Sequence, residues 1–308
     1  MKYLVTGGAG FIGSHIAEKL VNRGDDVTIV DNLCTGKLEN LASFENRVKF
    51  VHGDIRDFNL MKDISRGIDI IFHEAAVASV SLSIEDPVAT DAVNVGGTVS
   101  VLTAAKENGI RKVVFASSAA VYGDEPTLPK TEDMPPKPLS PYAFHKLAGE
   151  YYLRLFRQLY GLNGVALRYF NVYGPRQDPS SEYSGVISIF IDRFKRDIDY
   201  TIYGDGKQSR DFIYVEDVAR ANLAAASTHF DDVPIINVAC NRSNDLLKLV
   251  GVLQEISGSN RAPQFGPERT GDIKHSLADN SRLKALLAIT PEIEFSEGLQ
   301  RLWESVQV

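Results

Sequence analysis

The chain of 308 residues is long enough for two domains, or for one large domain with an added lobe. Its 44% hydrophobic and 24% charged residues are typical of a globular protein and argue against wholesale disorder. Thirty-three Lys and Arg residues against forty Asp and Glu residues give a net charge of -7, which disfavours a protein that wraps nucleic acid or lies on an anionic membrane.

The two cysteines, Cys34 and Cys240, stand far apart, and neither has a His or Cys near it at a metal-ligand spacing. We therefore expect neither a disulfide framework nor a metal site. The N-terminal residues lack the apolar run of a signal peptide, and no later stretch approaches the roughly 18 apolar residues that span a bilayer. These patterns predict a soluble, cytoplasmic protein without nucleic-acid or membrane partners.

In the first half of the chain, short β-branched runs alternate with amphipathic segments of helix length, which is typical of repeated strand-helix-strand units. The predicted strands are 2–6, 27–30, 48–51, 68–73, 112–117 and 164–168. The predicted helices are 11–23, 60–66, 91–108 and 141–160. Because the run 113–116 is wholly apolar, we expect this strand to be covered on both faces. The pattern predicts an α/β fold with a Rossmann-type doubly wound parallel sheet.

After about Arg168 the strands shorten, and further helices are predicted at 186–195, 215–227, 246–257, 280–287 and 296–305. We expect residues 1–170, together with about 210–236, to form the domain that holds the sheet. Residues 171–209 and 237–308 are predicted to form a smaller α/β lobe that binds substrate.

A glycine-rich turn follows the first predicted strand, with Gly7, Gly10 and Gly13 opening an amphipathic helix. Such glycines allow a tight turn and let the backbone approach a pyrophosphate at the helix N-terminus. Asp31 ends the second strand, close to the interval of about 20 residues expected for an acid that binds a ribose hydroxyl. A carboxylate there would repel the 2′-phosphate of NADP, and Asn32 rather than Arg follows it, so NAD is the predicted cofactor.

Two acids in this region have alternative interpretations. Asp31 would also fit a solvated residue at a strand end. Asp54, in the segment Gly53-Asp54-Ile55-Arg56-Asp57, either reaches the adenine amino group or makes a turn and a helix cap.

Tyr142 and Lys146 are four residues apart on a predicted helix, so their side chains share a face. Together with Ser118, at the end of a predicted strand, they complete a Ser–Tyr–Lys constellation. For a tyrosine to act as a base near neutrality its pKa must fall by roughly 3 units, which a nearby ammonium and a positive nicotinamide ring could supply. Without such chemistry, these would be helix-surface residues and a turn-forming serine.

With these motifs the chain resembles the extended short-chain dehydrogenase/reductase family, and within it the nucleotide-sugar 4-epimerases of the UDP-galactose 4-epimerase type. The resemblance extends over essentially the whole chain. Beyond the glycine turn, Asp31 and Tyr142-x-x-x-Lys146, it rests on Gly53-Asp54, His73-Glu74-Ala75-Ala76, Asn94-Val95-Gly96-Gly97-Thr98, Ser117-Ser118-Ala119-Ala120-Val121-Tyr122-Gly123, Arg168-Tyr169-Phe170-Asn171-Val172-Tyr173-Gly174-Pro175, Ser209-Arg210-Asp211-Phe212 and Arg269-Thr270-Gly271-Asp272.

The resemblance implies site residues of three kinds. The implied catalytic residues are Ser118, Tyr142 and Lys146. The implied NAD-binding residues are Gly7, Gly10, Phe11, Ile12, Gly13, Asp31, Asn32, Asp54, Ile55, Ala75, Ala76, Asn94, Ser117, Tyr142, Lys146 and Tyr169. The implied substrate-binding residues are Ser118, Asn171, Val186, Tyr203, Arg210, Arg269, Asp272 and Ser276.

The resemblance also implies roles for the residues that would bind the nucleotide of the substrate. Asn171 would bond the phosphate region and Tyr203 would stack on the uracil. Arg210 and Arg269 would clamp the pyrophosphate, since a guanidinium engages phosphate oxygens bidentately, and Asp272 would bind a ribose hydroxyl.

Within the family, 4,6-dehydratases carry an Asp-Glu pair after the active serine or threonine, and UDP-glucuronate decarboxylases carry a glutamate in the same segment, where this chain has Ala119 and Ala120. A 4-keto intermediate would then only accept the hydride on its other face, which is 4-epimerisation. The expected reaction interconverts UDP-glucose and UDP-galactose. The small Ser276 predicts that UDP-GlcNAc and UDP-GalNAc are accepted as well.

Other functions stay open at this point. One is a UDP-glucuronate epimerase or decarboxylase, or a nucleotide-sugar dehydratase. Another is a non-catalytic sensor that binds NAD. In similar proteins the helices that correspond to 91–108 and 141–160 build a four-helix dimer interface, so a homodimer is expected, with apolar surface from Phe144, Tyr151, Leu155 and Leu159.

Overall fold

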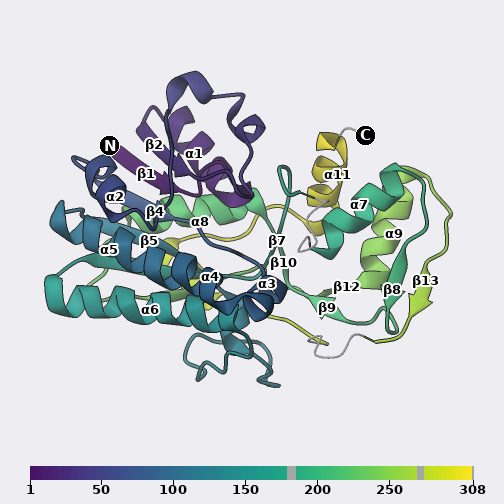
Figure 1. Cartoon of the computed structure of the whole chain (residues 1–308). Helices are drawn as coiled ribbons and strands as arrows, with labels where there is room; N and C mark the ends of the chain where they lie inside the picture. Colours follow the sequence, from purple (N-terminus) through teal and green to yellow (C-terminus); the bar gives the residue numbers. More distant parts are fainter. Residues whose placement is uncertain (179–184, 269–273, 307–308) are drawn as a thin grey trace.

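A seven-stranded parallel sheet with the strand order β11-β6-β5-β4-β1-β2-β3 forms the centre of the computed structural model, which describes residues 1–178, 185–268 and 274–306 (Figure 1). Its strands are β1 (Lys2–Thr6), β2 (Asp26–Asp31), β3 (Lys49–His52), β4 (Ile70–His73), β5 (Lys112–Ser118), β6 (Asn163–Tyr169) and β11 (Ile235–Val238). The predicted Rossmann-type α/β fold is confirmed.

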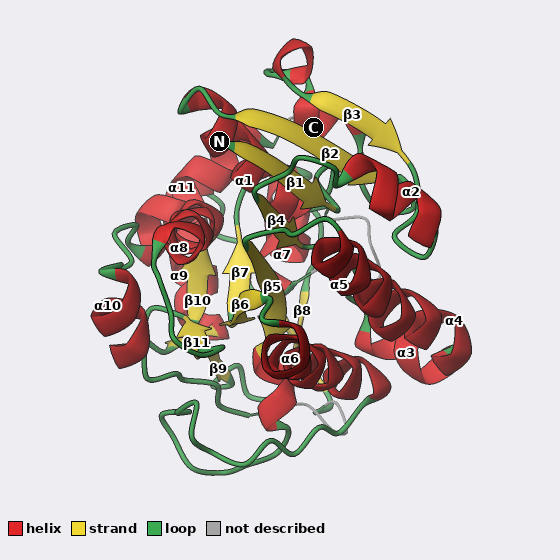
Figure 2. Ribbon diagram, turned by 90° about the vertical axis from the view of Figure 1, so that its left-hand side faces the viewer, coloured by secondary structure: helices red, strands yellow, loops and turns green. Residues whose placement is uncertain are grey.

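Helices cover both faces of the sheet (Figure 2). One face packs against α1 (Phe11–Asn22), α8 (Val215–Ser227) and α10 (Ser281–Leu287), and the other against α2 (Phe58–Ile64), α5 (Thr98–Glu107) and α6 (Pro141–Tyr160). Because side chains alternate along a strand, Val114 and Ala116 join the first core while Val113 and Phe115 join the second. The expectation that this apolar strand is covered twice is therefore confirmed.

The predicted helix 91–108 is interrupted in the structure. It consists of α4 (Pro87–Asp91), a π-helical segment η3 (Ala92–Gly97) and α5, and it follows α3 (Val80–Glu85), which the sequence did not predict. Ser79 and Asp86 cap these two short helices by accepting from Leu82 N–H and Ala89 N–H. Both caps precede residue 91, so the helical region begins earlier than predicted and in two separate short helices.

The smaller lobe has a hydrophobic core of its own, which contains α7 (Val186–Lys195), α9 (Leu246–Ser257) and α11 (Phe295–Ser305) and lies among short paired strands. Those strands are β7 (Asn171–Tyr173) with β10 (Phe212–Tyr214), β9 (Ser209–Arg210) with β12 (Asn244–Asp245), and β8 (Thr201–Tyr203) with β13 (Gln264–Gly266). Leu283 and Leu287 of α10 lie in the core of the sheet, although the predicted division gave 237–308 to the smaller lobe. The division itself stays a prediction.

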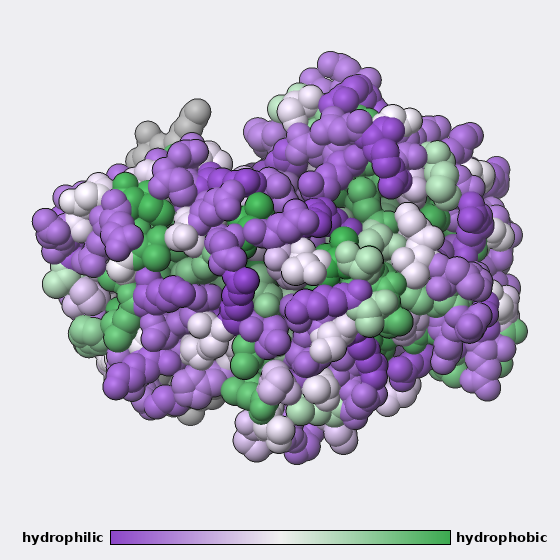
Figure 3. Space-filling model, turned by 180° about the vertical axis from the view of Figure 1, so that it is seen from behind, coloured by the Kyte–Doolittle hydropathy of each residue, from purple (hydrophilic) through white to green (hydrophobic). Residues whose placement is uncertain are grey.

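The rear face of the molecule is mainly hydrophilic, with hydrophobic side chains gathered in small groups (Figure 3). Within the described ranges, no helix is long and apolar enough to cross a membrane. The same residues contain no cluster of three or more His, Cys, Asp or Glu side chains that could hold a metal ion.

Candidate active site

A cleft of about 270 Å³ lies at the carboxyl ends of β1, β2 and β4, the edge at which open parallel sheets bind ligands. We call it the glycine-turn cleft. It is lined by Gly7, Gly10, Phe11, Ile12, Gly13, Val30, Asp31, Asn32, Cys34, Thr35, Gly53, Asp54, Ile55, Glu74, Ala75, Ala76, Val77, Ala78 and Val93. Eleven of these were predicted from the sequence as NAD-binding residues.

The glycine turn has no room for side chains. Gly7 has φ +66°, and a Cβ on it would lie 2.7 Å from the Ala75 nitrogen. A Cβ on Gly13 would lie 2.3 Å from the Gly7 carbonyl oxygen. At the N-cap of α1 stands Gly10, which has no side chain to occupy the first N–H groups of the helix. The turn therefore leaves a helix N-terminus open to an anion.

Two acids of the cleft are held in different ways. Asp31 is 8% exposed and accepts from the N–H groups of Ala9, at 3.0 Å, and Leu33, at 2.8 Å. Asp54 accepts two hydrogen bonds from the Arg56 guanidinium and one from the Asn32 amide. The Arg56 hydrogen bonds, the largest cause, hold the pKa of Asp54 well below its usual range. Both acids are acceptors at the wall of the cleft.

Ser118, Tyr142 and Lys146 come from neighbouring elements, since Ser118 ends β5 and the other two lie in the first turns of α6. The Lys146 ammonium donates to the Ala116 carbonyl at 2.8 Å and lies 5.9 Å from the centroid of the Tyr142 ring. Burial raises the pKa of Tyr142 above its ordinary value, and a hydrogen bond with Ser118 partly offsets this. The three side chains thus form one cluster, in which Lys146 is buried and Ser118 and Tyr142 are half-buried.

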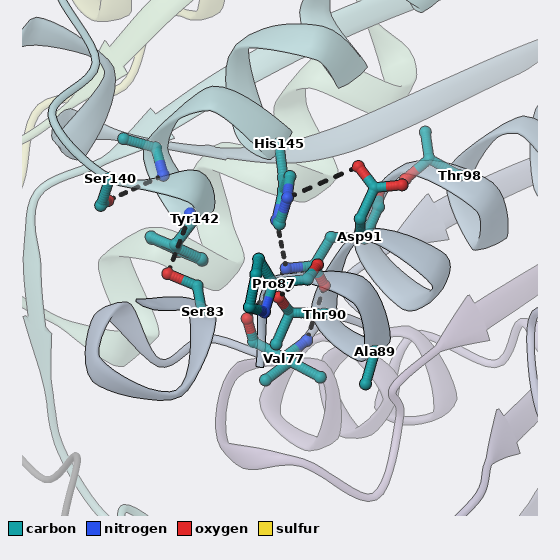
Figure 4. A network of polar contacts seen from close by, with 12 residues as sticks. Val77, Ser83, Pro87, Ala89, Thr90, Asp91, Thr98, Ser140, Tyr142 and His145 are labelled. Atoms are coloured by element: carbon teal, nitrogen blue, oxygen red, sulfur yellow. Dashed lines mark hydrogen bonds and ion pairs between the residues drawn. The ribbon is translucent and has the colours of Figure 1, made fainter. Parts of the chain in front are cut away.

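The start of α6 is fixed by polar contacts (Figure 4). The Tyr142 N–H donates to Ser83 Oγ at 3.1 Å, and Ser140 Oγ caps the helix by accepting from Ala143 N–H at 3.2 Å. Because Pro141 occupies the first turn, the missing N–H leaves no donor unsatisfied. These contacts hold the turn that carries Tyr142.

Behind this turn, His145 is 3% exposed and lies 3.4 Å from the Asn94 amide and 3.6 Å from the Asp91 carboxylate (Figure 4). Asn94 accepts from Val77 N–H at 2.8 Å and donates to the Val77 carbonyl at 3.0 Å. The predicted cofactor residue Asn94 therefore binds the backbone beside the cleft and does not line it. Its reach to Val77 comes from the π-helical segment η3.

Two further residues of the predicted cofactor set also have their side chains committed within the chain. Ser117 Oγ donates to Glu150 at 2.6 Å, and Glu150 receives two parallel bonds of 2.8 Å from the Arg168 guanidinium. The Tyr169 hydroxyl donates to Glu74 at 2.9 Å. Both networks lie directly behind the ends of β4, β5 and β6.

His73, the last residue of β4, is held as a neutral ring. Thr98 Oγ1 uses its proton on the Asn94 carbonyl at 2.6 Å, so it must accept from His73 Nε2–H at 3.0 Å. His73 Nδ1 then accepts from the Thr6 hydroxyl at 2.8 Å, whose oxygen accepts from Ala75 N–H. Burial lowers the pKa of His73 to about 3.

A second pocket, of about 330 Å³, lies in the smaller lobe, and we call it the lobe pocket. It brings together four predicted substrate residues, Asn171, Val186, Tyr203 and Arg210. Ser276 is half-buried beside it, its N–H donating to the Ser209 carbonyl at 3.0 Å. Of the other predicted substrate residues, Ser118 belongs to the cluster at α6, and Arg269 and Asp272 lie outside the described residues.

Sequence reasoning missed several residues of both sites. The lobe pocket is also lined by Gln177, Phe190, Thr201 and Leu246, which belong to no motif, and by Phe212, which was noticed only as part of a motif. Glu74 was noticed only as part of a motif, although its position directly after the last residue of a central parallel strand is a signal for a ligand-facing residue.

The fold and the two pockets are those of a known group of enzymes. The NAD dependent epimerase/dehydratase family matches residues 3–239. The chain therefore belongs to this family. The UDP-glucose 4-epimerase of Mycolicibacterium smegmatis is 40% identical over 308 residues, which cover 99% of this chain and 98% of that protein.

Two solved structures are similar along almost the whole chain. The UDP-N-acetylglucosamine 4-epimerase of Methanobrevibacter ruminantium, in complex with UDP-N-acetylmuramic acid, has a TM-score of 0.95 at 42% identity and covers 99% of this chain and 97% of its own. The UDP-glucose 4-epimerase of Thermus thermophilus, in complex with NAD, has a TM-score of 0.90 at 40% identity and covers 99% and 98%. The chain is thus a nucleotide-sugar epimerase family member with NAD as its cofactor.

The glycine-turn cleft fits NAD. At Gly7 and Gly13 the backbone leaves a space that a Cβ would fill. This space lies beside the open N-terminus of α1, and together they suit a pyrophosphate. The buried acceptor Asp31 suits a ribose with two free hydroxyls, and Asn32, not an arginine, follows it in the chain.

Proposed function

We propose that the protein is a UDP-sugar 4-epimerase, an isomerase that interconverts UDP-glucose and UDP-galactose, and also UDP-GlcNAc and UDP-GalNAc, through a 4-keto intermediate. The observation that carries the proposal is the cluster of Ser118, Tyr142 and Lys146 at the end of β5 and the start of α6. A protein that only binds NAD has no need of this cluster.

The proposed roles follow from the chemistry of the side chains. Tyr142 Oη removes the proton from the sugar 4-hydroxyl and later returns it. The Lys146 ammonium stabilises the phenolate by its charge, and Ser118 Oγ orients the sugar hydroxyl. When bound, NAD would supply the hydride acceptor for the sugar carbon and a positive ring that favours the phenolate, which burial alone disfavours.

The proposed binding residues divide between the two pockets. The NAD site comprises the predicted residues that line the glycine-turn cleft, with the backbone beside it held by Asn94. The UDP site comprises the lobe pocket, where Tyr203 stacks on the base and Arg210 meets the phosphates. Arg269 and Asp272 join this site in the proposal on the family resemblance alone.

The reaction type is proposed from what the active segment lacks. Ala119 and Ala120 begin a 3₁₀ turn directly after Ser118 and offer neither an acid nor a base. Elimination of water or carbon dioxide needs such a group, whereas epimerisation needs only the base that is already present.

The breadth of substrate is proposed from Ser276. Its small side chain leaves room for a 2-acetamido group. Replacing Ser276 by Tyr should selectively lower turnover of UDP-GlcNAc and UDP-GalNAc, and equal losses on all four sugars would contradict this part of the proposal.

We also propose a homodimer. Phe144, Tyr151, Leu155 and Leu159 of α6 are 57%, 54%, 46% and 63% exposed, and they recur at helical spacing on the outer side of this helix. Four large apolar side chains on one helix are an unfavourable surface in water and a suitable one for a second copy.

A mass-resolved substrate screen tests the function. The purified protein is incubated with UDP-galactose, UDP-GalNAc, UDP-glucuronate and a dTDP-sugar, and the products are read by mass and by their anomeric proton signals. We expect new anomeric signals at unchanged mass with the first two. Loss of water would indicate a dehydratase, loss of carbon dioxide a decarboxylase, and no conversion a non-catalytic NAD-binding protein.

A further inference from the structure

Glu74 lies between the glycine-turn cleft and the cluster of Ser118, Tyr142 and Lys146. It directly follows β4, its backbone N–H donates to the Thr6 carbonyl at 3.2 Å, and it lines the glycine-turn cleft. Its carboxylate accepts from the Tyr169 hydroxyl at 2.9 Å. Because His73 pairs with Phe115 across β4 and β5, Glu74 lies next to Ala116, whose carbonyl accepts from the Lys146 ammonium at 2.8 Å. The roles proposed above use neither Glu74 nor the polar chain behind it.

The hydrogen bonds behind Glu74 run in one direction. Asn222 Nδ2 has two protons, which it donates to the Val218 carbonyl at 2.9 Å and to the Tyr169 oxygen at 2.8 Å. The single Tyr169 proton can go to Glu74 or to Asn222 Oδ1 at 3.0 Å. A carboxylate is the stronger acceptor, so the Tyr169 proton goes to Glu74 once Glu74 is ionised. Glu74 is thus held in place from behind.

Lys146 needs such a charge because it is buried. Burial lowers the pKa of Lys146 to about 8, and Glu74 is the charge that opposes this fall. Burial likewise raises the pKa of Glu74 to about 7, against the effects of Tyr169 and Lys146. Each charge therefore makes the other less costly in the protein interior.

The other titratable groups around Lys146 do not supply this negative charge. His73 of β4 and His145 of α6 both have a pKa that burial lowers, so near neutrality their rings are uncharged. Burial raises the pKa of Tyr142, so near neutrality its hydroxyl carries no negative charge in the protein without NAD. Asp91 faces the far side of His145 and is 59% exposed in its side chain.

We propose that Glu74 is a positioning residue for Lys146: its carboxylate, held by the Tyr169 hydroxyl, is the counter-ion that keeps the ammonium charged at the Ala116 carbonyl. The inference rests on the proposed function, in which the Lys146 charge stabilises the Tyr142 phenolate. It adds to that function a residue that determines over which pH range the charge persists.

The variant Glu74→Gln tests the proposal, because it keeps the shape and an acceptor for Tyr169 while removing the charge. The titration of the Lys146 side chain is followed by NMR on lysine-labelled, NAD-loaded protein without substrate, with Lys146→Met to assign the signal. In Glu74→Gln we expect Lys146 to lose its proton about one pH unit lower than in the parent protein. The alkaline limb of the pH–kcat profile should move by the same amount, while the acid limb and the NAD content stay unchanged.

The matched control is Glu132→Gln. Glu132 is another buried carboxylate, with 2% of its side chain exposed, and it accepts from Asn237 N–H at 2.8 Å, away from Lys146. This control should leave the Lys146 titration in place. A second variant, Tyr169→Phe, removes the donor behind Glu74 and should move the Lys146 titration in the same direction by a smaller amount, which gives a result if Glu74→Gln does not fold.

An unchanged Lys146 titration in Glu74→Gln, or an equal shift in Glu132→Gln, would overturn the proposal. Because the Lys146 titration is measured without substrate, it tests the role of Glu74 even if the substrate screen finds no epimerisation. Failure of the proposed function and failure of the role of Glu74 are therefore distinguishable.

Discussion

Arg168 and Glu150 form a two-pronged ion pair, both bonds 2.8 Å long, with 2% of either side chain exposed. The Arg168 guanidinium also lies 4.7 Å from the centroid of the Tyr122 ring, and Glu150 accepts from Ser117. The pair joins β6 to α6 directly behind the end of β5, which carries Ser118. The position of this segment therefore depends on a buried ion pair.

Removing one member of this pair should destabilise the protein strongly. We expect Glu150→Leu to lower the free energy of unfolding by about 3–5 kcal/mol, because Arg168 stays buried without its partner. The double variant Glu150→Leu, Arg168→Met should recover most of the loss. Urea denaturation measures both. The control is Asp63→Ala, which breaks an exposed pair with Arg66 and should cost less than about 1 kcal/mol; equal losses in the two single variants would contradict the prediction.

Gly13→Ala should weaken NAD binding. The new methyl group would lie 2.3 Å from the Gly7 carbonyl oxygen, so the turn must open. Overpacking of this kind costs about 1–3 kcal/mol, which corresponds to about tenfold to hundredfold weaker binding. The NAD released on denaturing the purified variant reports the occupancy. Gly251→Ala, in α9 with nothing within 4 Å of the new Cβ, is the control and should retain NAD fully.

Tyr142→Phe should abolish epimerisation while leaving the fold and the NAD content unchanged. Loss of a positioned base lowers the rate by about 10²–10⁴-fold. The coupled assay with UDP-galactose measures this, and the paired control is Tyr160→Phe, at the other end of α6, where the ring is 53% exposed. Activity within a few-fold of the parent protein would exclude Tyr142 as the base.

Acid should destabilise the protein through His73. Its pKa is about 3 in the folded chain, against about 6.5 in the unfolded chain, so between these values the unfolded state binds the extra proton. Stability therefore falls as the pH falls below 6.5, by about 2 kcal/mol at pH 5 from this group.

His73→Gln should flatten this dependence, because an amide does not titrate. Urea midpoints at pH 7 and pH 5 give the slope for each protein. His229, with 83% of its side chain exposed, offers the comparison, since His229→Gln should keep the slope of the parent protein. The prediction fails if His73→Gln is as acid-sensitive as His229→Gln.

Leu159→Arg should dissociate the proposed homodimer. Leu159 is 63% exposed on α6, and a charge buried against a second copy would be unpaired. Light scattering after size exclusion should give a dimer of the 33.9 kDa chain for the parent protein and a monomer for the variant. A parent protein that is monomeric would remove the basis for this prediction.

Elements with clear ends could be predicted from the sequence. The limits of α6 and α9 agree with the prediction, because Ser140 and Asp245 cap their starts and Gly161 and Gly258, at φ +73° and +70°, end them. The segment at 79–97 could not be predicted in the same way. Its caps at Ser79 and Asp86 are local, but they lie outside the predicted helix 91–108. Its π-helical turn carries Asn94, whose contacts with Val77 join residues 17 positions apart and form only on folding.

The candidate site shows the same difference between local sequence patterns and tertiary contacts. The glycine turn and Asp31 are local patterns, and they lie together in the glycine-turn cleft. Glu74 accepts from Tyr169 of β6, which in turn bonds Asn222 of α8, and no spacing in the sequence indicates these contacts. Motifs therefore predicted residues that line the cleft, whereas the contacts of Glu74 required the tertiary structure.

The 20-residue helix α6 carries Tyr142 and Lys146 in its first turns and exposed Leu155 and Leu159 in its last turns. At 1.5 Å per residue, its two ends are about 30 Å apart. A rigid rod of this length transmits a tilt at one end to the other. In the proposed homodimer, contacts along α6 would therefore also restrain the orientation of Tyr142, the proposed base.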